Sequence, residues 1–211
     1  MLKLFYGAGA CSLASHITLE EIGQPYETYS VNMAKGEHKS PEYLKINPRG
    51  KVPALQIDQQ FLIENVAIQN YLAKRFPEAN LSPKDPLAES RWLSVNAWLS
   101  NSVHPAFGRW NRPMNFTPEE SAYPAIKEAG RKAFWDCLAE IDGMLAGKTW
   151  MQGDQYTTSD PYALVFYGWS LRIPEIDAKQ LKNFTAHKER MLQRPAVRKV
   201  LEREQSPLLK T

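Results

Sequence analysis

The sequence predicts an α/β domain followed by an all-helical domain, on two observations. Within residues 1–77, short apolar runs alternate with helical patterns in the order βαβ and then ββα. Over residues 87–211, strand patterns largely disappear and apolar residues recur at helical spacing. Residues 78–86 lie between these patterns and are polar and proline-containing, which is typical of a linker.

The first unit is predicted to be a strand, a helix and a parallel strand. Residues 2–6 form a short apolar and aromatic run, and the helical pattern begins at Cys11 or Ser12. Gly23 suits the end of that helix. Residues 26–31 then alternate as a strand, and two strands joined through a helix form a right-handed parallel unit.

The second unit is predicted to be a hairpin and a helix. After a short helical piece at residues 41–46, strands are expected at 54–57 and 61–63, separated by a three-residue turn. Glu64 and Asn65 then open a helix. The combined order is that of a thioredoxin-like domain, with helices on the faces of a mixed sheet.

The rest of the chain is predicted to be helical. Residues 157–160 read Thr-Thr-Ser-Asp, a variant capping box in which Asp160 reaches back to the start of the helix. His187 is expected on a solvated face. The other predicted helices are residues 86–103, 119–146, 179–192 and 195–203.

Composition excludes several function classes. The net charge of +3 in 211 residues is too weak to indicate nucleic acid binding. No apolar run approaches the roughly 20 residues that span a bilayer. Cys11 and Cys137 are far apart and no His, Cys, Asp and Glu grouping has metal spacing. With no secretory pattern at the start, we expect a cytoplasmic, metal-free protein.

Residues 49–54 read Arg-Gly-Lys-Val-Pro-Ala and form a sharp turn before a strand. Pro53 is a candidate for a cis bond with Val52, which would turn the Val52 backbone toward an extended ligand. The alternative interpretation is an ordinary hairpin loop.

Cys11 and Ser12 follow the first strand, where open α/β sheets commonly hold their sites. Helix N–H groups and the helix dipole there are expected to lower the thiol pKa of Cys11. The alternatives are a small buried hydrophobe for Cys11 and a helix cap for Ser12. Cys137 is expected in the core.

Five further residues are candidates for binding or chemistry. Glu64 and Asn65 begin a helix, where N–H groups can hold a carboxylate and Glu64 an amine. Lys35 and Lys51 lie in loops at the same end of the sheet and could meet a carboxylate. His104, expected at a helix end, could act as a base or donor. Each has a plain alternative as a solvated or helix-terminal residue.

With these residues in view, the chain resembles the cytosolic glutathione transferases and, within them, the bacterial beta class. The Val-Pro-Ala run and the Glu-x-x-Ala-Ile pattern are specific to the family, and Ala-Cys-Ser with a histidine near position 104 is specific to the class. The matching segments are residues 9–12, 47–54, 64–68, 103–105 and 157–160, which span nearly the whole chain.

The resemblance implies a glutathione-binding N-terminal domain, with glutathione as co-substrate and no other cofactor. Asn65 and Lys51 depart from the residues common in the family, and Ser102 replaces a carboxylate. The implied contacts are Val52 and Pro53 for the cysteinyl part, Glu64 and Asn65 for the γ-glutamyl part, and Lys35 and Lys51 for the glycine carboxylate.

The resemblance further implies a detoxifying homodimeric transferase in which the glutathione sulfur attacks a hydrophobic electrophile. Cys11, Ser12 and His104 would surround that sulfur. The alternatives are thiol–disulfide exchange through Cys11 and a non-catalytic binder. The helical domain would carry the electrophile side of the site. Its aromatic residues are candidates for that pocket, and the equal alternative is that they belong to the core: Trp98, Phe107, Trp110, Tyr167 and Trp169.

Overall fold

The N-terminal part of the protein is a mixed sheet with helices on both faces. The computed structural model describes residues 1–210. Strand order is β2-β1-β3-β4, with β1 parallel to β2 and antiparallel to β3, and β3 antiparallel to β4. The elements are β1 (Leu2–Tyr6), α1 (Leu13–Ile22), β2 (Tyr26–Ser30), α2 (Pro41–Ile46), β3 (Ala54–Ile57), β4 (Gln60–Ile63) and α3 (Asn65–Arg75). The predicted βαβ–ββα order and thioredoxin-like sheet are confirmed.

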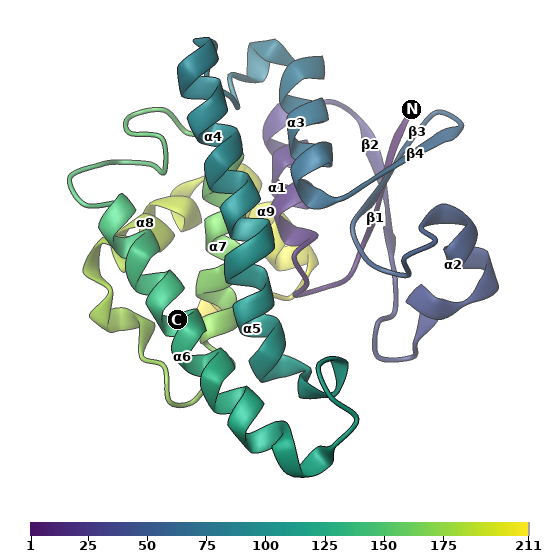
Figure 1. Ribbon diagram of the computed structural model, residues 1–211. Coiled ribbons are helices and arrows are strands. Elements are labelled where there is room, and N and C mark those ends of the chain that lie inside the picture. The colour runs from purple at the N-terminus through teal and green to yellow at the C-terminus, as the bar shows by residue number, and fades with distance from the viewer. Residues whose placement is uncertain (211) are drawn as a thin grey trace.

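The two faces of the sheet carry separate cores because side chains alternate along each strand. Leu4 of β1 and Leu55 of β3 pack toward α1 and α3. Phe5 points to the other face and packs with Tyr43 of α2. Figure 1 shows α2 on the side of the sheet away from the helical remainder, with α1 and α3 on the near side.

The remainder of the chain is helical, as predicted. Helix α7 lies at its centre and is buried along almost its whole length. It packs against α1, so the core of the helical part continues onto the first helix of the sheet domain. The helices are α4 (Pro86–Trp98), α5 (His104–Asn111), α6 (Tyr123–Met144), α7 (Ser159–Ser170), α8 (Lys182–Gln193) and α9 (Pro195–Arg203).

The helix predicted to end at residue 103 continues to residue 111. A π-helical turn at Leu99–Val103 joins α4 to α5, so His104 begins α5 rather than ending a helix. Pro105 has no backbone N–H to donate the α-helical hydrogen bond to the preceding turn. The π-helical turn lies where this hydrogen bond is missing. Helix α5 packs mainly against α6.

Two other predicted details differ. Helix α1 begins at Leu13, so Cys11 and Ser12 precede its first turn. The β3–β4 turn holds two residues, because Asp58 adopts a left-handed conformation with φ of 54° and Gln60 already pairs with Ile57.

The capping box forms, and it involves a buried histidine. Asp160 accepts from the Thr157 N–H at 2.8 Å, as predicted. In a full capping box the Thr157 hydroxyl would accept from the Asp160 N–H, but here it accepts from the Ser159 N–H. His187 lies 2.9 Å from Asp160 and is fully buried, so the expectation of a solvated face was wrong. None of the helices in residues 1–210 has the length and apolarity needed to cross a membrane.

Candidate functional site

A cavity of about 480 Å³ lies between the sheet domain and helices α5 and α7. Its wall on the sheet side comes from the loop after β1, the loop before β3 and the start of α3. Of the residues that the structure describes, the predicted Ser12 and Lys35 do not line it. The predicted residues that do are Cys11, Lys51, Val52, Pro53, Glu64, Asn65 and His104.

Cys11 reaches the cavity as a half-buried thiol. Its Sγ donates to the Val52 carbonyl at 3.5 Å. Burial raises the thiol pKa to about 12; nearby backbone N–H groups and Lys51 oppose the shift, and Glu64 adds to it. The expected lowering of this pKa was therefore wrong: desolvation of the thiolate outweighs the donors at the start of α1.

Ser12 is fully buried and holds the loop that carries Cys11. Its hydroxyl accepts from Gly7 N–H at 3.1 Å and lies 3.2 Å from Gly7 C=O, to which it donates. These two contacts close the turn after β1. Ser12 thus positions Cys11 instead of pointing at the cavity.

The loop before β3 presents a backbone edge to the cavity. The Val52–Pro53 bond is cis, as predicted. Asn47 and Tyr43 fix the loop by donating to Lys51 C=O at 2.6 and 2.8 Å. Nothing in residues 1–210 accepts a hydrogen bond from Val52 N–H. An extended ligand can therefore pair with it.

The start of α3 supplies one exposed acid and one buried amide. Glu64 is exposed, has φ of 72° and pairs with Arg49. Asn65 is the first residue of α3 rather than its cap, and its side chain is buried. The amide accepts from the Ser15 hydroxyl and donates to Cys11 C=O at 2.9 Å. Asn65 therefore links α3 to the loop that holds the thiol.

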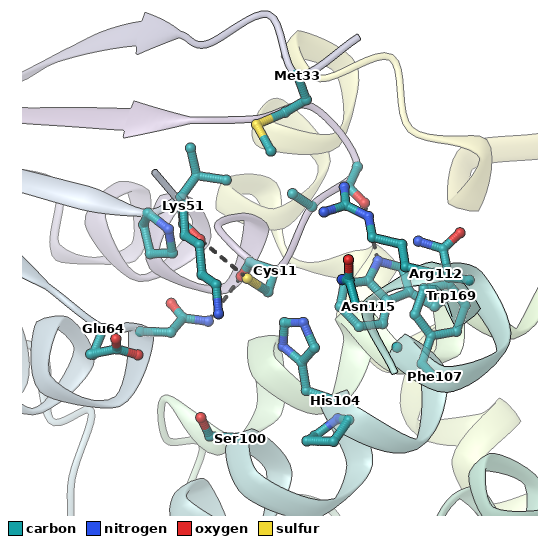
Figure 2. Close-up of a pocket in the computed structure, with 18 of the residues that line it drawn as sticks. Cys11, Met33, Lys51, Glu64, Ser100, His104, Phe107, Arg112, Asn115 and Trp169 are labelled. Atoms are coloured by element: carbon teal, nitrogen blue, oxygen red, sulfur yellow. Dashed lines mark hydrogen bonds between the residues drawn. The ribbon is translucent and has the colours of Figure 1, made fainter. Parts of the chain in front are cut away.

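His104 enters the cavity from the helical side, across from Cys11 (Figure 2). Its ring meets the edge of the Trp169 ring with centroids 4.8 Å apart. Burial, with smaller contributions from the positive charges of Lys51 and Arg112, lowers the pKa of His104 to about 4, and the negative charge of Glu64 opposes the shift. The imidazole is thus neutral at pH 7, with hydrogen-bonding capacity but no charge.

Gly9 is held from both sides by Trp169, an aromatic candidate from the sequence, and by Glu204 and Arg172, which the sequence did not point to. Its N–H donates to Glu204 at 3.1 Å, and its C=O accepts from Trp169 at 3.0 Å and Arg172 at 2.6 Å. Glu204 is itself bonded to buried His16 at 2.7 Å. A Cβ at Gly9 would lie 2.7 Å from the Arg172 guanidinium, and φ is +68°. In the sequence, the one sign of this close packing is the pair of glycines that follows β1, Gly7 and Gly9.

The helical wall of the cavity is aromatic and cationic. Phe107 and Trp169 stack with ring centroids 4.4 Å apart. The other aromatic candidates, Trp98, Trp110 and Tyr167, lie outside the lining formed by residues 1–210. The lining residues that the sequence did not point to include Arg112, Asn115 and Arg172.

Comparison with known proteins identifies the family. Residues 1–74 match the glutathione S-transferase N-terminal domain. The chain is 32% identical over 206 residues to glutathione S-transferase GstA of Escherichia coli O157:H7, covering 96% of this chain and 98% of that protein. It is 34% identical to GST-4.5 of Xanthomonas campestris, with the same coverage. The chain belongs to the glutathione S-transferase family.

Solved structures agree with this placement. A beta class enzyme of Sphingomonas chungbukensis superposes with a TM-score of 0.83 at 36% identity, over 96% of this chain and 98% of that one. A Sulfitobacter glutathione transferase homologue, solved with bound glutathione, superposes with a TM-score of 0.91 at 28% identity, again over 96% and 98%. The resemblance to the family and to its bacterial beta class is confirmed.

Proposed function

We propose that this protein catalyses attack of the glutathione sulfur on an electrophilic carbon in the cavity. The observation that carries the proposal is the convergence there of Cys11, the cis Val52–Pro53 turn and His104. The cavity also joins a backbone edge suited to a peptide and an aromatic wall suited to an apolar partner. Glutathione has this peptide character, and relatives of this chain have been solved with it bound.

Glutathione is proposed to bind along the sheet side. The free N–H of Val52 pairs with the cysteinyl part, next to Pro53. Glu64 takes the γ-glutamyl ammonium, and the first N–H groups of α3, at Asn65, take its carboxylate. Lys51 takes the glycine carboxylate. Lys35 is exposed outside the cavity, so it is left out of this assignment.

The chemistry requires the sulfur to be held as a thiolate. Lowering a thiol pKa by about two units takes about 2.7 kcal/mol of differential stabilisation. Charge-assisted hydrogen bonds contribute about 1.5–3 kcal/mol each. With its pKa raised to about 12, Cys11 stays a thiol and donates its S–H to the glutathione sulfur, turning from Val52 C=O. Neutral His104 donates a second bond from the opposite wall.

Thiol–disulfide exchange is the weaker alternative. Exchange through Cys11 needs its thiolate as the attacking group, and burial raises the pKa of this thiol. Intact-protein mass spectrometry tests the alternative after incubation with glutathione disulfide. A dithiothreitol-sensitive glutathione adduct on Cys11 would support exchange, and an unmodified thiol would support conjugation.

Conjugation of chlorodinitrobenzene with glutathione, followed by absorbance, tests the proposed function. We expect turnover above the uncatalysed rate. Cys11→Ala should lose less than about tenfold in kcat/KM, because His104 and the start of α1 still support the thiolate. A Cys11→Ala protein that binds glutathione but has lost all activity would contradict this division of roles.

We also propose the division of the chain into a glutathione-binding domain of residues 1–77, a linker at 78–86 and a helical domain at 87–211. A homodimer is proposed from the family and can be tested by light scattering. Both cysteines are free, which is consistent with a proposed cytoplasmic location. Fluorescence microscopy of a tagged protein tests the location.

A further inference from the structure

The helical wall of the cavity carries more positive charge than glutathione binding uses. Arg112 and Arg172 both line the cavity on this side. Lys51 lies on the opposite side of Cys11 from Arg112 (Figure 2) and is already assigned to glutathione. Two guanidinium groups are therefore left facing the space where the electrophile binds.

Neither guanidinium group is neutralised by the protein. Among residues 1–210, no carboxylate forms an ion pair with Arg112 or Arg172. Glu64, the acid in the lining, is exposed and pairs with Arg49. Burial of Arg172 lowers its pKa, and no acid opposes that shift. An arginine in a cavity without a counter-ion is free to bind an anion.

Arg172 is an exposed residue, but one hydrogen bond ties its guanidinium to the wall of the cavity. It donates one bond to Gly9 C=O at 2.6 Å, and Gly9 has no side chain in the space that the guanidinium occupies. The remaining N–H groups of the fork stay available to a ligand.

Arg112 is placed by the end of α5 and reaches the same space. The Arg112 side chain is exposed and lines the same cavity as His104, whose pKa its positive charge helps to lower. Figure 2 shows Arg112 and Asn115 beside Trp169. The Phe107–Trp169 stack lies in the same wall, next to these donors.

We propose that the electrophile is an anionic one: a flat apolar body that packs on Phe107 and Trp169 and carries a carboxylate bound by Arg112 and Arg172. This inference rests on the proposed transferase function and names its substrate class. In a representative step, the glutathione thiolate attacks the carbon that bears chlorine in a chloronitrobenzoate. The C–S bond forms, chloride leaves with the bonding electron pair, and the thiol proton passes to solvent.

A matched pair of electrophiles tests the proposal. We use para-chloro-meta-nitrobenzoate and its methyl ester, and divide each kcat/KM by the uncatalysed rate constant with glutathione. This division removes the intrinsic reactivity of the two compounds. The ratio should favour the carboxylate by about tenfold or more, the effect of one charge-assisted hydrogen bond. Equal ratios in the unaltered protein would overturn the proposal.

Arg112→Gln removes one guanidinium and keeps the amide donors. It should cut the preference for the carboxylate to within about threefold, while the KM for glutathione stays within twofold. Arg91→Gln is the matched control, because Arg91 is an exposed arginine of α4 outside the cavity lining. If Arg112→Gln raises the KM for glutathione and slows both electrophiles equally, Arg112 serves glutathione and the proposal fails.

Binding of the two product conjugates, measured by calorimetry, separates this inference from the proposed function. The carboxylate conjugate should bind about tenfold more tightly than the ester conjugate. If no electrophile is turned over but this preference holds, the transferase function fails and the anion site stands. If both electrophiles are turned over and the conjugates bind equally, the function stands and the inference fails.

Discussion

The sheet side and the helical side of the cavity are built from different parts of the chain. On the sheet side, Val52 and the start of α3 line the cavity, and side chains such as Asn65 and Ser12 hold those segments in place. On the helical side, the side chains of Phe107, Arg112 and Trp169 face it directly. A backbone edge suits one constant peptide, whereas a side-chain wall can change with each substitution.

The two sides also differ in what supports them. Trp169 belongs to α7, the buried centre of the helical part, and its indole N–H holds Gly9 C=O. The helical part therefore fixes the loop that carries Cys11. Substitutions on the helical side can therefore disturb the sheet side.

Trp169→Ala should have the largest effect. It removes a buried indole, its stack on Phe107 and its bond to Gly9, and we expect the free energy of unfolding to fall by about 3–5 kcal/mol. Denaturant unfolding measures this. Trp169→Phe is the control: it keeps the stack, loses the bond and should cost about 1 kcal/mol. Equal losses in both variants would show that the bond, not the packing, dominates.

Asn65→Ala should lower the free energy of unfolding by about 1–3 kcal/mol, because buried Ser15 Oγ loses its partner and Cys11 C=O keeps only its bond from Ala14 N–H. It should also weaken glutathione binding, since the amide fixes the Cys11 loop; calorimetry measures that. Asn101→Ala deletes an exposed amide and should change stability by no more than about 0.5 kcal/mol. An Asn65→Ala protein as stable as this control would refute the positioning role.

His104 should make stability depend on pH in acid. Its pKa is about 4 in the folded protein against 6.5 for an ordinary histidine, so the unfolded chain binds more protons between these values. Stability therefore falls as pH drops from 6.5 toward 4. In His104→Gln, the free energy of unfolding should depend less on pH between 6.5 and 4, as denaturant unfolding at several pH values measures. An unchanged pH dependence in this variant would mean that other titrating groups cause it.

Lys51→Ala should have the smallest effect and sharpen the contrast with Lys35. Lys51 is exposed at the cavity, so loss of its contact to a carboxylate is expected to raise the KM for glutathione by about two- to fivefold. Lys35→Ala removes the same charge outside the lining and should leave this KM unchanged. Steady-state kinetics at low salt measures both. Equal effects would place Lys35 in the site after all.

Sequence reasoning reached most of the sheet side, because its elements follow one another within residues 1–77. The alternation of strands and the Val-Pro-Ala turn are local patterns, and the turn made Pro53 a candidate for the cis bond that the structure has. The same reasoning placed Ser12 and Lys35 at the site, and the fold turns one inward and leaves the other in solvent. The direction of the Ser12 side chain depends on where α1 begins, and that of Lys35 depends on the course of a loop. Neither feature follows from a periodic pattern in the sequence.

The two-part architecture, the family and the segments on the sheet side of the site follow from local periodicity and short motifs. Phe107 and Trp169 were also candidates from the sequence, but the electrostatics of the site and the cationic residues of the helical wall depend on contacts that form only on folding. Burial in the folded chain raises the pKa of Cys11 and lowers that of His104. Glu204, Trp169 and Arg172 meet Gly9 across more than 150 positions, a contact that packing alone creates.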